Sequence, residues 1–360
     1  MNNTLTPLDI IIGGLERGGT QRNCVNIANM LSAKGHEVKI TTVRKVNNFG
    51  YLDELDQKVN LNSLNHKKTI TAFISLIRVI KNTEEGSTIL IMNNQLLPIV
   101  VFIAKLMGKK NKILFRNMNY ISKSIESDSI LIEKFFLKYL MMLALPFVDV
   151  VIHQCKDMSD DFNSFFIFQP RGSVVINNVL SSSQKKPLQK INHEPYLLLV
   201  GKLLPQKNIK FAIDILNLFH KKHNRISLLI IGKGKLLQEL KTYAKEKSLC
   251  EYVKFLGKKN NVNDYYSGAY ATILTSDYEG FPNVLIESIS CGTPVVAHNC
   301  KSGPRELIIN GKNGFLVDYQ NILEFVDALF KIKDIDRSNI SSTIKNYLPN
   351  NVYSQYSKII

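Results

Sequence analysis

Two glutamates, Glu279 and Glu287, stand eight positions apart in the segment EGFPNVLIES, around a Phe-Pro pair. Glu287 has Leu285, Ile286 and Ile289 as neighbours, and a carboxylate buried in such a setting is costly unless a partner meets it. Carboxylates accept hydrogen bonds from sugar hydroxyls, so the pair can hold two polyhydroxylated groups that flank a phosphate. The structural alternative is one glutamate at a helix start and another at the core edge, paired with a lysine.

The same segment predicts a loop that leads into a helix. Pro282 suits the first turn of a helix, and Gly280 gives the preceding loop conformational freedom. Backbone N–H groups at the start of a helix have no partner inside it, so they can point toward a ligand at the strand end. The residues of this segment that we expect near a ligand are Gly280, Phe281, Pro282, Asn283 and Val284.

Two lysines follow a predicted strand in the sequence LLLVGKLLPQKN. Gly201 ends the strand, and Lys202 and Lys207 follow in the loop before the next predicted helix. Two ammonium groups at the end of a strand can stabilise a diphosphate, each as a point charge. Lysines also occupy solvated loops routinely, so this pattern alone leaves the structural interpretation open.

Glycine turns follow three other predicted strands. In GGLERGGT, Gly19 precedes a predicted helix that Thr20 can cap, and such a turn favours an anion at the helix N-terminus. Gly232 lies in the sequence IIGKGK, and Gly257 lies in FLGKKNNV. Such turns are common in α/β folds and are weak signs of a ligand on their own.

Short runs rich in Ile, Val and Leu alternate with helical patterns along most of the chain. They cover residues 8–15, 37–43, 87–94, 111–117, 149–154 and 173–177, then 196–202, 226–234, 252–257, 270–276, 294–298 and 314–317. These runs are too continuous for strands with one solvated face, so they predict parallel strands buried on both faces with helices between them. Two such series predict an α/β chain of two Rossmann-like, doubly wound domains.

The domain boundaries follow from a polar, proline-containing stretch. We expect an N-terminal domain at 1–180, a linker at 181–194, a C-terminal domain at 195–345 and a helix within 346–360 that packs back on the first domain. In open parallel sheets ligands bind at the carboxyl ends of the strands, so the cleft between the two domains is the expected site.

The net charge of the 360 residues is +16, with +9 in residues 1–190 and +7 in residues 191–360. A charge spread in this way suits an anionic partner, such as a diphosphate or an anionic membrane surface, and equally well serves solubility. Nucleic-acid binding is disfavoured because the basic residues are dispersed and no binding module is present. A dehydrogenase is disfavoured because no G-x-G-x-x-G follows the first strand.

Five scattered cysteines without metal-ligand spacing indicate reduced thiols in a cytosolic protein. No signal peptide is evident, and no apolar run reaches the roughly 18 residues that a spanning helix needs. The sequence therefore favours a cytoplasmic protein.

The chain resembles the family-4 retaining glycosyltransferases of the GT-B fold (glycosyl transferases group 1) over almost its full length. The resemblance rests on the GG-T-Q-R turn with LSAKGHEVKITTV, on LLLVGKLLPQKN, and on VKFLGKKNNVNDYYSGAYATILTSDYEGFPNVLIESISCGTPVVA. The family's motif of Glu, seven residues, Glu is met by Glu279 and Glu287. This motif is specific in its context, whereas the glycine turns are not.

The resemblance implies a role for each matching residue. Glu287 would bind the ribose hydroxyls of a nucleotide, and Glu279, with the backbone of Gly280, Phe281 and Pro282, would hold the transferred sugar. Lys202 and Lys207 would stabilise the departing diphosphate as catalytic groups together with Glu279. Gly19 would let the first domain close over the donor. The segment FLGKKNNV, which contains Gly257, would lie near the nucleotide base and contact it largely through its backbone.

The chain departs from the family pattern in two places. Lys202 stands where the family usually has arginine, so the charge is kept but the bidentate geometry is not. Some members have a histidine near the end of the fourth strand, where this chain reads FRNMNYIS. Arg116, Asn117 and Asn119 are therefore the candidate residues on the acceptor side.

The expected reaction is metal-independent, because fixed cations and helix dipoles can stabilise a leaving diphosphate. We expect front-side attack with retention, in which the leaving phosphate oxygen accepts the acceptor's proton. The Asp-x-Asp sequence at 334–336 lies in a polar helical region and reads as a solvated face, so no divalent metal and no other cofactor is expected.

The donor implied by the resemblance is a nucleotide diphosphate sugar, with UDP favoured. The acceptor would be a lipid-linked or growing bacterial surface glycan, such as O-antigen or capsule. Helical patterns at 66–81 and 131–147 combine lysines with broad apolar faces. These helices fit peripheral contact with the anionic inner face of the cytoplasmic membrane.

Two functions from other classes remain open at this stage. A nucleotide-sugar epimerase of the same fold would convert donor without any acceptor. A catalytically silent glycan- or nucleotide-binding protein would bind UDP without turnover, and it would have little reason to keep both glutamates.

Overall fold

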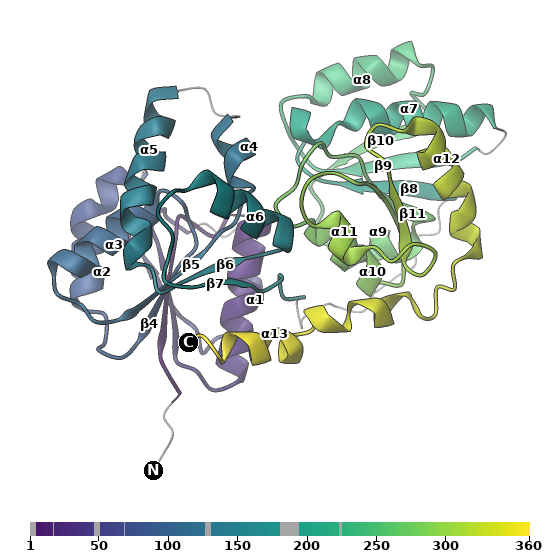
Figure 1. Ribbon diagram of the computed structural model, residues 1–360. Coiled ribbons are helices and arrows are strands. Elements are labelled where there is room, and N and C mark those ends of the chain that lie inside the picture. Colours follow the sequence, from purple (N-terminus) through teal and green to yellow (C-terminus); the bar gives the residue numbers. More distant parts are fainter. Residues whose placement is uncertain are drawn as a thin grey trace. The chain divides into compact units, whose positions relative to one another are not determined.

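The computed structural model describes residues 5–16, 18–46, 51–67, 69–126, 131–180, 194–222 and 225–360. The chain divides into two compact units, one of residues 1–183 with 346–360 and one of residues 184–345. Each unit is a parallel sheet between helices (Figure 1). The predicted linker lies outside the described residues except for Glu194.

The first unit contains a seven-stranded sheet in the order β3-β2-β1-β4-β5-β6-β7, and every pairing in it is parallel. Its strands are β1 (Leu8–Ile12), β2 (Val38–Thr42), β3 (Asn60–Ser63), β4 (Thr88–Ile91), β5 (Lys112–Arg116), β6 (Val150–His153) and β7 (Ser173–Val175). Its α-helices are α1 (Gly19–Ala33), α2 (Phe73–Lys81), α3 (Leu96–Leu106), α4 (Ile121–Glu126), α5 (Leu131–Ala144), α6 (Lys156–Phe165) and α13 (Pro349–Tyr356).

Successive strand residues of the first sheet enter two different cores, because side chains alternate between the faces of a strand. Ile89 and Ile91 of β4 pack with α2, α3, α5 and α6, whereas Leu90 packs with α1 and α13. Burial on both faces explains why these strands are continuous apolar runs.

Two details of the first unit correct the sequence analysis. Strand β3 was not predicted, because its sequence NLNS is polar and it lies at the edge of the sheet with partly exposed side chains. Thr20 does not cap α1: the helix begins at Gly19 after an extended Gly18, with no side-chain hydrogen bond at the cap.

Helix α13 packs against α1 and closes the core of the first unit, with Val352 and Tyr356 buried. The hydroxyl of Tyr353 lies 3.2 Å from Nε2 of His36 on the segment after α1. The hydroxyl of Tyr356 accepts a hydrogen bond of 2.7 Å from the guanidinium of Arg116 at the end of β5. These contacts fix α13 to both a helix and the sheet.

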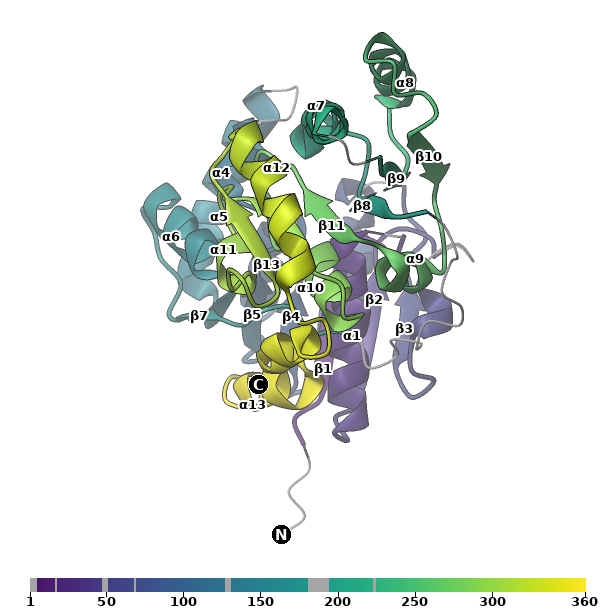
Figure 2. The ribbon, with the colours of Figure 1, turned by 90° about the vertical axis from the view of Figure 1, so that its right-hand side faces the viewer.

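The second unit contains a six-stranded parallel sheet in the order β10-β9-β8-β11-β12-β13. Its strands are β8 (Tyr196–Val200), β9 (Ser227–Ile231), β10 (Val253–Gly257), β11 (Ala271–Leu274), β12 (Val295–His298) and β13 (Gly314–Val317). Its α-helices are α7 (Ile209–Lys221), α8 (Leu237–Glu246), α9 (Val262–Gly268), α10 (Asn283–Ser290), α11 (Pro304–Leu307) and α12 (Ile322–Lys331). Helices α7, α8 and α12 lie on one face of this sheet, and α9, α10 and α11 lie on the other (Figures 1 and 2).

The direction of winding reverses between β8 and β11, which are neighbours in the sheet. The chain runs outward from β8 to β10 and then crosses back to β11. In open α/β sheets such a reversal point is where ligands bind, because the loops after the two strands turn to opposite faces and leave a crevice. No helix in the described part of the chain is long and apolar enough to cross a membrane.

Candidate active site

The predicted lysines and the first predicted glutamate meet at the reversal point of the second sheet. Lys202 follows β8, and Lys207 ends a 3-10 turn at Pro205–Lys207 in the same loop. Glu279 lies in the loop after β11. Since β8 and β11 are adjacent and parallel, both loops leave the same edge of the sheet side by side.

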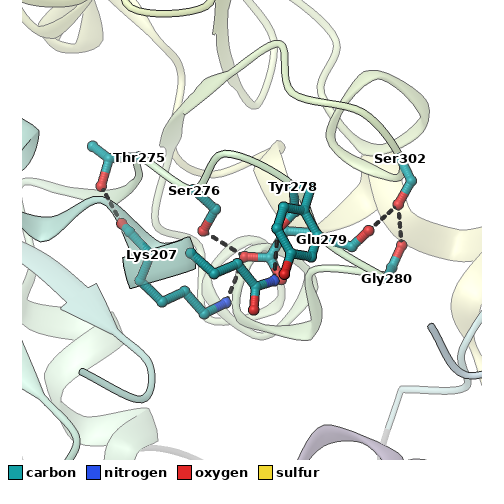
Figure 3. A network of polar contacts seen from close by, with 8 residues as sticks. Lys207, Thr275, Ser276, Tyr278, Glu279, Gly280 and Ser302 are labelled. Carbon is teal, nitrogen blue, oxygen red and sulfur yellow. Dashed lines mark hydrogen bonds and ion pairs between the residues drawn. The ribbon is translucent and has the colours of Figure 1, made fainter. Parts of the chain in front are cut away.

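Glu279 is buried and held by two donors (Figure 3). The ammonium of Lys207 and the hydroxyl of Ser276 each donate to its Oε1 at 2.5 Å. The side chains of Lys207 and Glu279 are 18% and 9% exposed. In the described part of the chain Oε2 of Glu279 has no hydrogen-bond partner, so one oxygen of a fixed carboxylate is left to accept from a ligand.

Lys202 differs from Lys207 in its surroundings. Its side chain is exposed, and it has no ion-pair partner among the described residues. The loop thus offers one solvated cation and one that is already paired, and the structure does not join the two lysines into a single clamp.

The loops after β8 and β11 are joined by backbone and side-chain hydrogen bonds. The hydroxyl of Thr275 donates to the carbonyl of Lys207 at 2.9 Å (Figure 3). The amide of Asp277 donates to the carbonyl of Gln206 at 2.9 Å, and the side chain of Gln206 donates to the carbonyl of Tyr278 at 2.7 Å. The positions of Lys207 and Glu279 are therefore set together.

Asn208 and Asp277 add a further link between the loops. Asn208 has a positive φ of 44°, the left-handed conformation that asparagine tolerates better than most residues. Its side-chain amide donates to Oδ1 of Asp277 at 3.2 Å, and the hydroxyl of Tyr319 donates to the same oxygen at 2.9 Å. Asp277 is thus committed to structure and not to a ligand.

The loop after β12 supports the backbone on both sides of Glu279. The buried hydroxyl of Ser302 contacts the carbonyls of Glu279 and Gly280 (Figure 3). The next residue, Gly303, has φ of 82°, and a Cβ there would overlap Cδ of Pro282. A glycine is required at this position for both reasons.

Helix α10 begins one residue later than the sequence analysis expected. Pro282 precedes the helix and does not lie in its first turn. The amides of Asn283 and Leu285 donate to the carbonyls of Phe281 and Pro282, each at 2.9 Å. The N–H of Asn283, a residue expected near a ligand, is therefore taken up by the turn itself, as is the N–H of Leu285.

Glu287 lies half-buried in the middle of α10, and its Oε2 accepts a hydrogen bond of 3.0 Å from the hydroxyl of Tyr266 on α9. The sequence analysis expected Glu287 to be the glutamate in a buried setting. The structure gives the deeper burial to Glu279, because α10 turns the apolar neighbours Leu285, Ile286 and Ile289 into the core and leaves Glu287 beside them at its edge.

The predicted glycines at the ends of β8, β9 and β10 have structural roles that differ from one to the next. A Cβ on Gly232 would overlap the carbonyl oxygen of Gly201, and the amide of Gly232 donates to the carbonyl of Gly257 at 2.9 Å. Gly257 has φ of 66° at a register shift of β10. The three positions share the carboxyl edge of the sheet with Lys207 and Glu279. A backbone contact explains Gly232 and the positive φ explains Gly257, whereas a Cβ on Gly201 would meet only the side chain of Lys207.

The candidates of the first unit separate into exposed and buried residues. Gly19 is the exposed first residue of α1, and Asn119 is exposed after β5. Asn117 is fully buried, with its amide 3.4 Å from Nδ1 of His153. Arg116 is fully buried and donates to the carbonyl of Ile176 at 3.0 Å as well as to Tyr356.

Arg116 also donates to Oδ1 of Asn178 at 2.8 Å. These partners are neutral, and no carboxylate contacts this guanidinium among the described residues. Arg116 therefore anchors α13 and is not exposed to an acceptor, which leaves Asn119 as the accessible member of the three acceptor-side candidates.

The Asp-x-Asp sequence lies at the surface. Asp334 and Asp336 are exposed, and Asp336 accepts hydrogen bonds from Ser338 and Asn339. In the ranges that the structure describes, no group of three or more His, Cys, Asp or Glu side chains is placed to hold a metal ion.

Four polar residues of this region were missed by the sequence analysis: Asn208, Tyr266, Ser276 and Asp277. Each stands within a loop or short helix that follows a predicted strand. A search of those loops for hydroxyl, amide and carboxylate side chains would have found them as candidates, but their partners depend on the sheet order.

Part of the chain is similar to a known family of proteins. Residues 181–346 match the model of the family described as glycosyl transferases group 1. The matched range covers the second unit of the chain. The predicted recognition is thereby confirmed, and the chain is a glycosyltransferase.

Two relatives of this glycosyltransferase illustrate the match. The amylovoran biosynthesis glycosyltransferase AmsD of Erwinia amylovora is 26% identical over 318 residues, which are 87% of this chain and 86% of that protein. The N-acetylgalactosamine-N,N'-diacetylbacillosaminyl-diphospho-undecaprenol 4-alpha-N-acetylgalactosaminyltransferase of Campylobacter jejuni is 30% identical over 230 residues, which are 62% of this chain and 60% of that protein.

Among solved structures, Anabaena HepE in complex with UDP and glucose matches with a TM-score of 0.78 and 16% identity, over 98% of this chain and 99% of that chain. The likeness shows that this glycosyltransferase has the GT-B fold, as predicted.

Proposed function

We propose that this glycosyltransferase moves a hexose or N-acetylhexosamine from a UDP-sugar to a lipid-linked or growing bacterial surface glycan, with retention of configuration. The observation that carries the proposal is the Lys207–Glu279 pair at the reversal point of the second sheet. The names of two relatives support the class of acceptor, since one is named for amylovoran and another for a diphospho-undecaprenol saccharide. The bound UDP of the matched structure supports the class of donor.

In this proposal the donor lies along the carboxyl edge of the second sheet. Glu287 accepts hydrogen bonds from the ribose hydroxyls, and Glu279 accepts through Oε2 from a hydroxyl of the transferred sugar. Lys202 and Lys207 stabilise the diphosphate, which competes with Glu279 for the ammonium of Lys207. Phosphate oxygens and ammonium groups form strong charge-assisted hydrogen bonds, so this exchange is favourable.

The reaction that follows breaks the bond between the anomeric carbon and the diphosphate oxygen. Positive charge builds on the sugar ring while negative charge builds on the leaving group, and the lysines stabilise the latter. The acceptor hydroxyl attacks from the same face, and its proton passes to the departing phosphate oxygen. Glu279 stays a hydrogen-bond acceptor and does not become a nucleophile.

The proposal assigns no role to a divalent metal or another cofactor. The charge that a metal would supply comes from two lysines at the strand ends. Transfer measured in excess EDTA is expected to proceed at the rate found without EDTA, and loss of transfer that Mg²⁺ or Mn²⁺ restores would overturn this part of the proposal.

The acceptor side includes peripheral contact with an anionic membrane. Helix α5 exposes Phe135, Phe136 and Tyr139, whose exposed fractions are 70%, 63% and 54%. On the same helix the ammonium of Lys138 lies 3.7 Å from the centroid of the Phe165 ring. Aromatic side chains beside lysines suit the boundary between headgroups and acyl chains of a bilayer.

Vesicle flotation tests this contact without any need for activity. The wild-type chain is expected to float with phosphatidylglycerol vesicles, and Phe135→Ser with Phe136→Ser is expected to reduce the bound fraction several-fold. Leu323→Ser provides the control, because Leu323 is 60% exposed on α12 of the second unit. Equal flotation of the wild type, the double variant and Leu323→Ser would show that α5 does not contact the membrane.

The donor chemistry is tested with a panel of UDP- and GDP-sugars and a short lipid-linked acceptor. A UDP-sugar is expected to be consumed with formation of a new glycosidic bond whose anomeric configuration, read by NMR, equals that of the donor. Glu279→Gln is expected to reduce transfer by at least a hundredfold. Inversion, or conversion of the donor without an acceptor, would replace the proposal by an inverting transferase or an epimerase.

A further inference from the structure

The hydroxyl of Tyr266 contacts a glutamate of the proposed donor site from inside the protein core. Tyr266 is fully buried in α9, and its hydroxyl lies 3.0 Å from Oε2 of Glu287. We propose that Tyr266 is a positioning residue for Glu287, and that α9 thereby takes part in recognising the nucleoside of the donor. This inference rests on the proposed function, in which Glu287 binds the ribose.

The ring and the backbone of Tyr266 are both held in place. It packs in a core cluster with Tyr196 and Leu198, and the carbonyl of Tyr266 accepts a hydrogen bond of 2.5 Å from the hydroxyl of Thr293. A phenol fixed in this way presents its O–H at a fixed point. A hydrogen bond to a carboxylate is charge-assisted, so it favours one orientation of the Glu287 side chain.

Orientation matters because a glutamate side chain has several rotatable bonds. A glutamate side chain that is not oriented loses rotamer entropy when it binds a ligand, and one that is already oriented loses less. A carboxylate has lone pairs enough to accept from Tyr266 and from ribose hydroxyls at the same time. The Tyr266 hydroxyl therefore acts on ribose affinity without touching the ribose.

Helix α9 also fixes the end of the loop after β10. The side chain of Asn261 donates to Oδ2 of Asp264 at 3.0 Å, and the amide of Asp264 lies 3.2 Å from the carbonyl of Asn261. This loop carries the sequence GKKNN, which was expected beside the nucleotide base. The start of α9 thus contacts the loop that we expect beside the nucleotide base. Near its end the same helix contacts Glu287, which binds the ribose in the proposed function.

Tyr196 offers a matched control for the hydroxyl of Tyr266. It is almost fully buried in the same cluster, and its hydroxyl donates to the carbonyl of Tyr265 at 2.7 Å. Tyr266→Phe and Tyr196→Phe each remove one buried hydroxyl and keep the ring. The first removes the hydrogen bond to Glu287, and the second removes the hydrogen bond to the carbonyl of Tyr265.

The experiment measures binding of UDP and of 2′-deoxy-UDP by calorimetry, together with kcat and KM for the UDP-sugar. Tyr266→Phe is expected to weaken UDP binding about tenfold, the scale of a hydrogen bond to a charged group, and to narrow the preference for UDP over 2′-deoxy-UDP. It is expected to raise KM by a similar factor and to leave kcat within about twofold. Tyr196→Phe is expected to leave the nucleotide preference unchanged.

A double variant decides whether Tyr266 acts through Glu287. Glu287→Gln with Tyr266→Phe is expected to bind UDP as Glu287→Gln does alone, because the hydroxyl has no carboxylate left to orient. Additive losses, or equal losses in Tyr266→Phe and Tyr196→Phe, would overturn the inference. If Glu287→Gln itself binds UDP like the wild type, the proposed function fails at its nucleoside site, whatever Tyr266 does.

Discussion

The ammonium of Lys207 lies 2.5 Å from Oε1 of Glu279, although the two residues are 72 positions apart in the chain. The stem of Lys207 runs beside Gly201, where a Cβ would lie 3.3 Å from Cε of the lysine. Each group compensates the charge of the other in a place where neither is well solvated. The pair is thus part of the fold before any donor binds.

Lys207→Met is expected to lower both transfer and stability. It leaves the buried carboxylate of Glu279 without its counter-ion, which costs on the order of 2–4 kcal/mol in the free energy of unfolding. Lys202→Met provides the control: its side chain is exposed, so transfer is expected to fall while stability stays within about 0.5 kcal/mol. Urea denaturation and initial rates measure the two quantities, and equal stability of both variants would show that the pair is not buried.

Gly303→Ala is expected to reduce transfer at least tenfold. The new Cβ meets Pro282, so the segment that carries Glu279 must shift, and a shift of about 1 Å can cost a hundredfold in rate. Gly311→Ala is the matched control, because Gly311 has a similar φ of 75° and nothing within 4 Å of a Cβ. Gly311→Ala is expected to lower the free energy of unfolding by about 1–2 kcal/mol and to leave the transfer rate unchanged. Identical rates in the two variants would contradict the prediction.

Tyr356→Phe is expected to loosen α13. The change removes the 2.7 Å hydrogen bond from Arg116 and leaves a buried guanidinium short of an acceptor, at a cost of about 1–3 kcal/mol. Hydrogen exchange of the α13 amides is expected to quicken accordingly. Tyr353→Phe removes a longer contact of 3.2 Å to His36 at a half-buried position and is expected to have the smaller effect. Faster exchange of the α13 amides in Tyr353→Phe than in Tyr356→Phe would show that Arg116 is not the main anchor of α13.

The stability of the first unit is expected to fall in weak acid because of His153. Burial, with a smaller contribution from Arg116, lowers the pKa of this histidine from 6.5 to about 4. The unfolded chain therefore binds more protons between these values, so the stabilisation is complete above pH 6.5 and is lost as the pH falls toward 4. The loss is on the order of 3 kcal/mol.

His153→Gln is expected to flatten this dependence. Urea midpoints measured by circular dichroism from pH 7 to pH 4 are expected to converge for the wild type and the variant at the acid end. Two curves that stay parallel over the whole range would assign the acid sensitivity to other groups.

The sheets were predictable from sequence because burial on both faces leaves an uninterrupted apolar signal. All twelve apolar runs became strands. Strand β3 was not predicted because Asn60–Ser63 at the sheet edge is not an apolar run. Its pairing with β2 depends on the rest of the sheet.

The candidate site was predictable in its residue types and not in its contacts. Glu279 and Lys207 stand out as charged residues after strands, but their pairing depends on β8 and β11 being neighbours. The burial of Glu279, and not of Glu287, depends on where α10 begins after Pro282. Arg116 shows the limit most clearly, because its partner Tyr356 lies 240 positions away.

The placement of α13 has a consequence for biosynthesis. A ribosome makes residues 184–345 before it makes α13, yet α13 belongs to the unit formed by residues 1–183. During translation the earlier unit stays incomplete until the later unit has been made, because the side of α1 that α13 covers is open and Arg116 lacks its hydrogen bond to Tyr356. If translation stops within residues 184–345, both units are therefore incomplete, because the first unit lacks α13 as well.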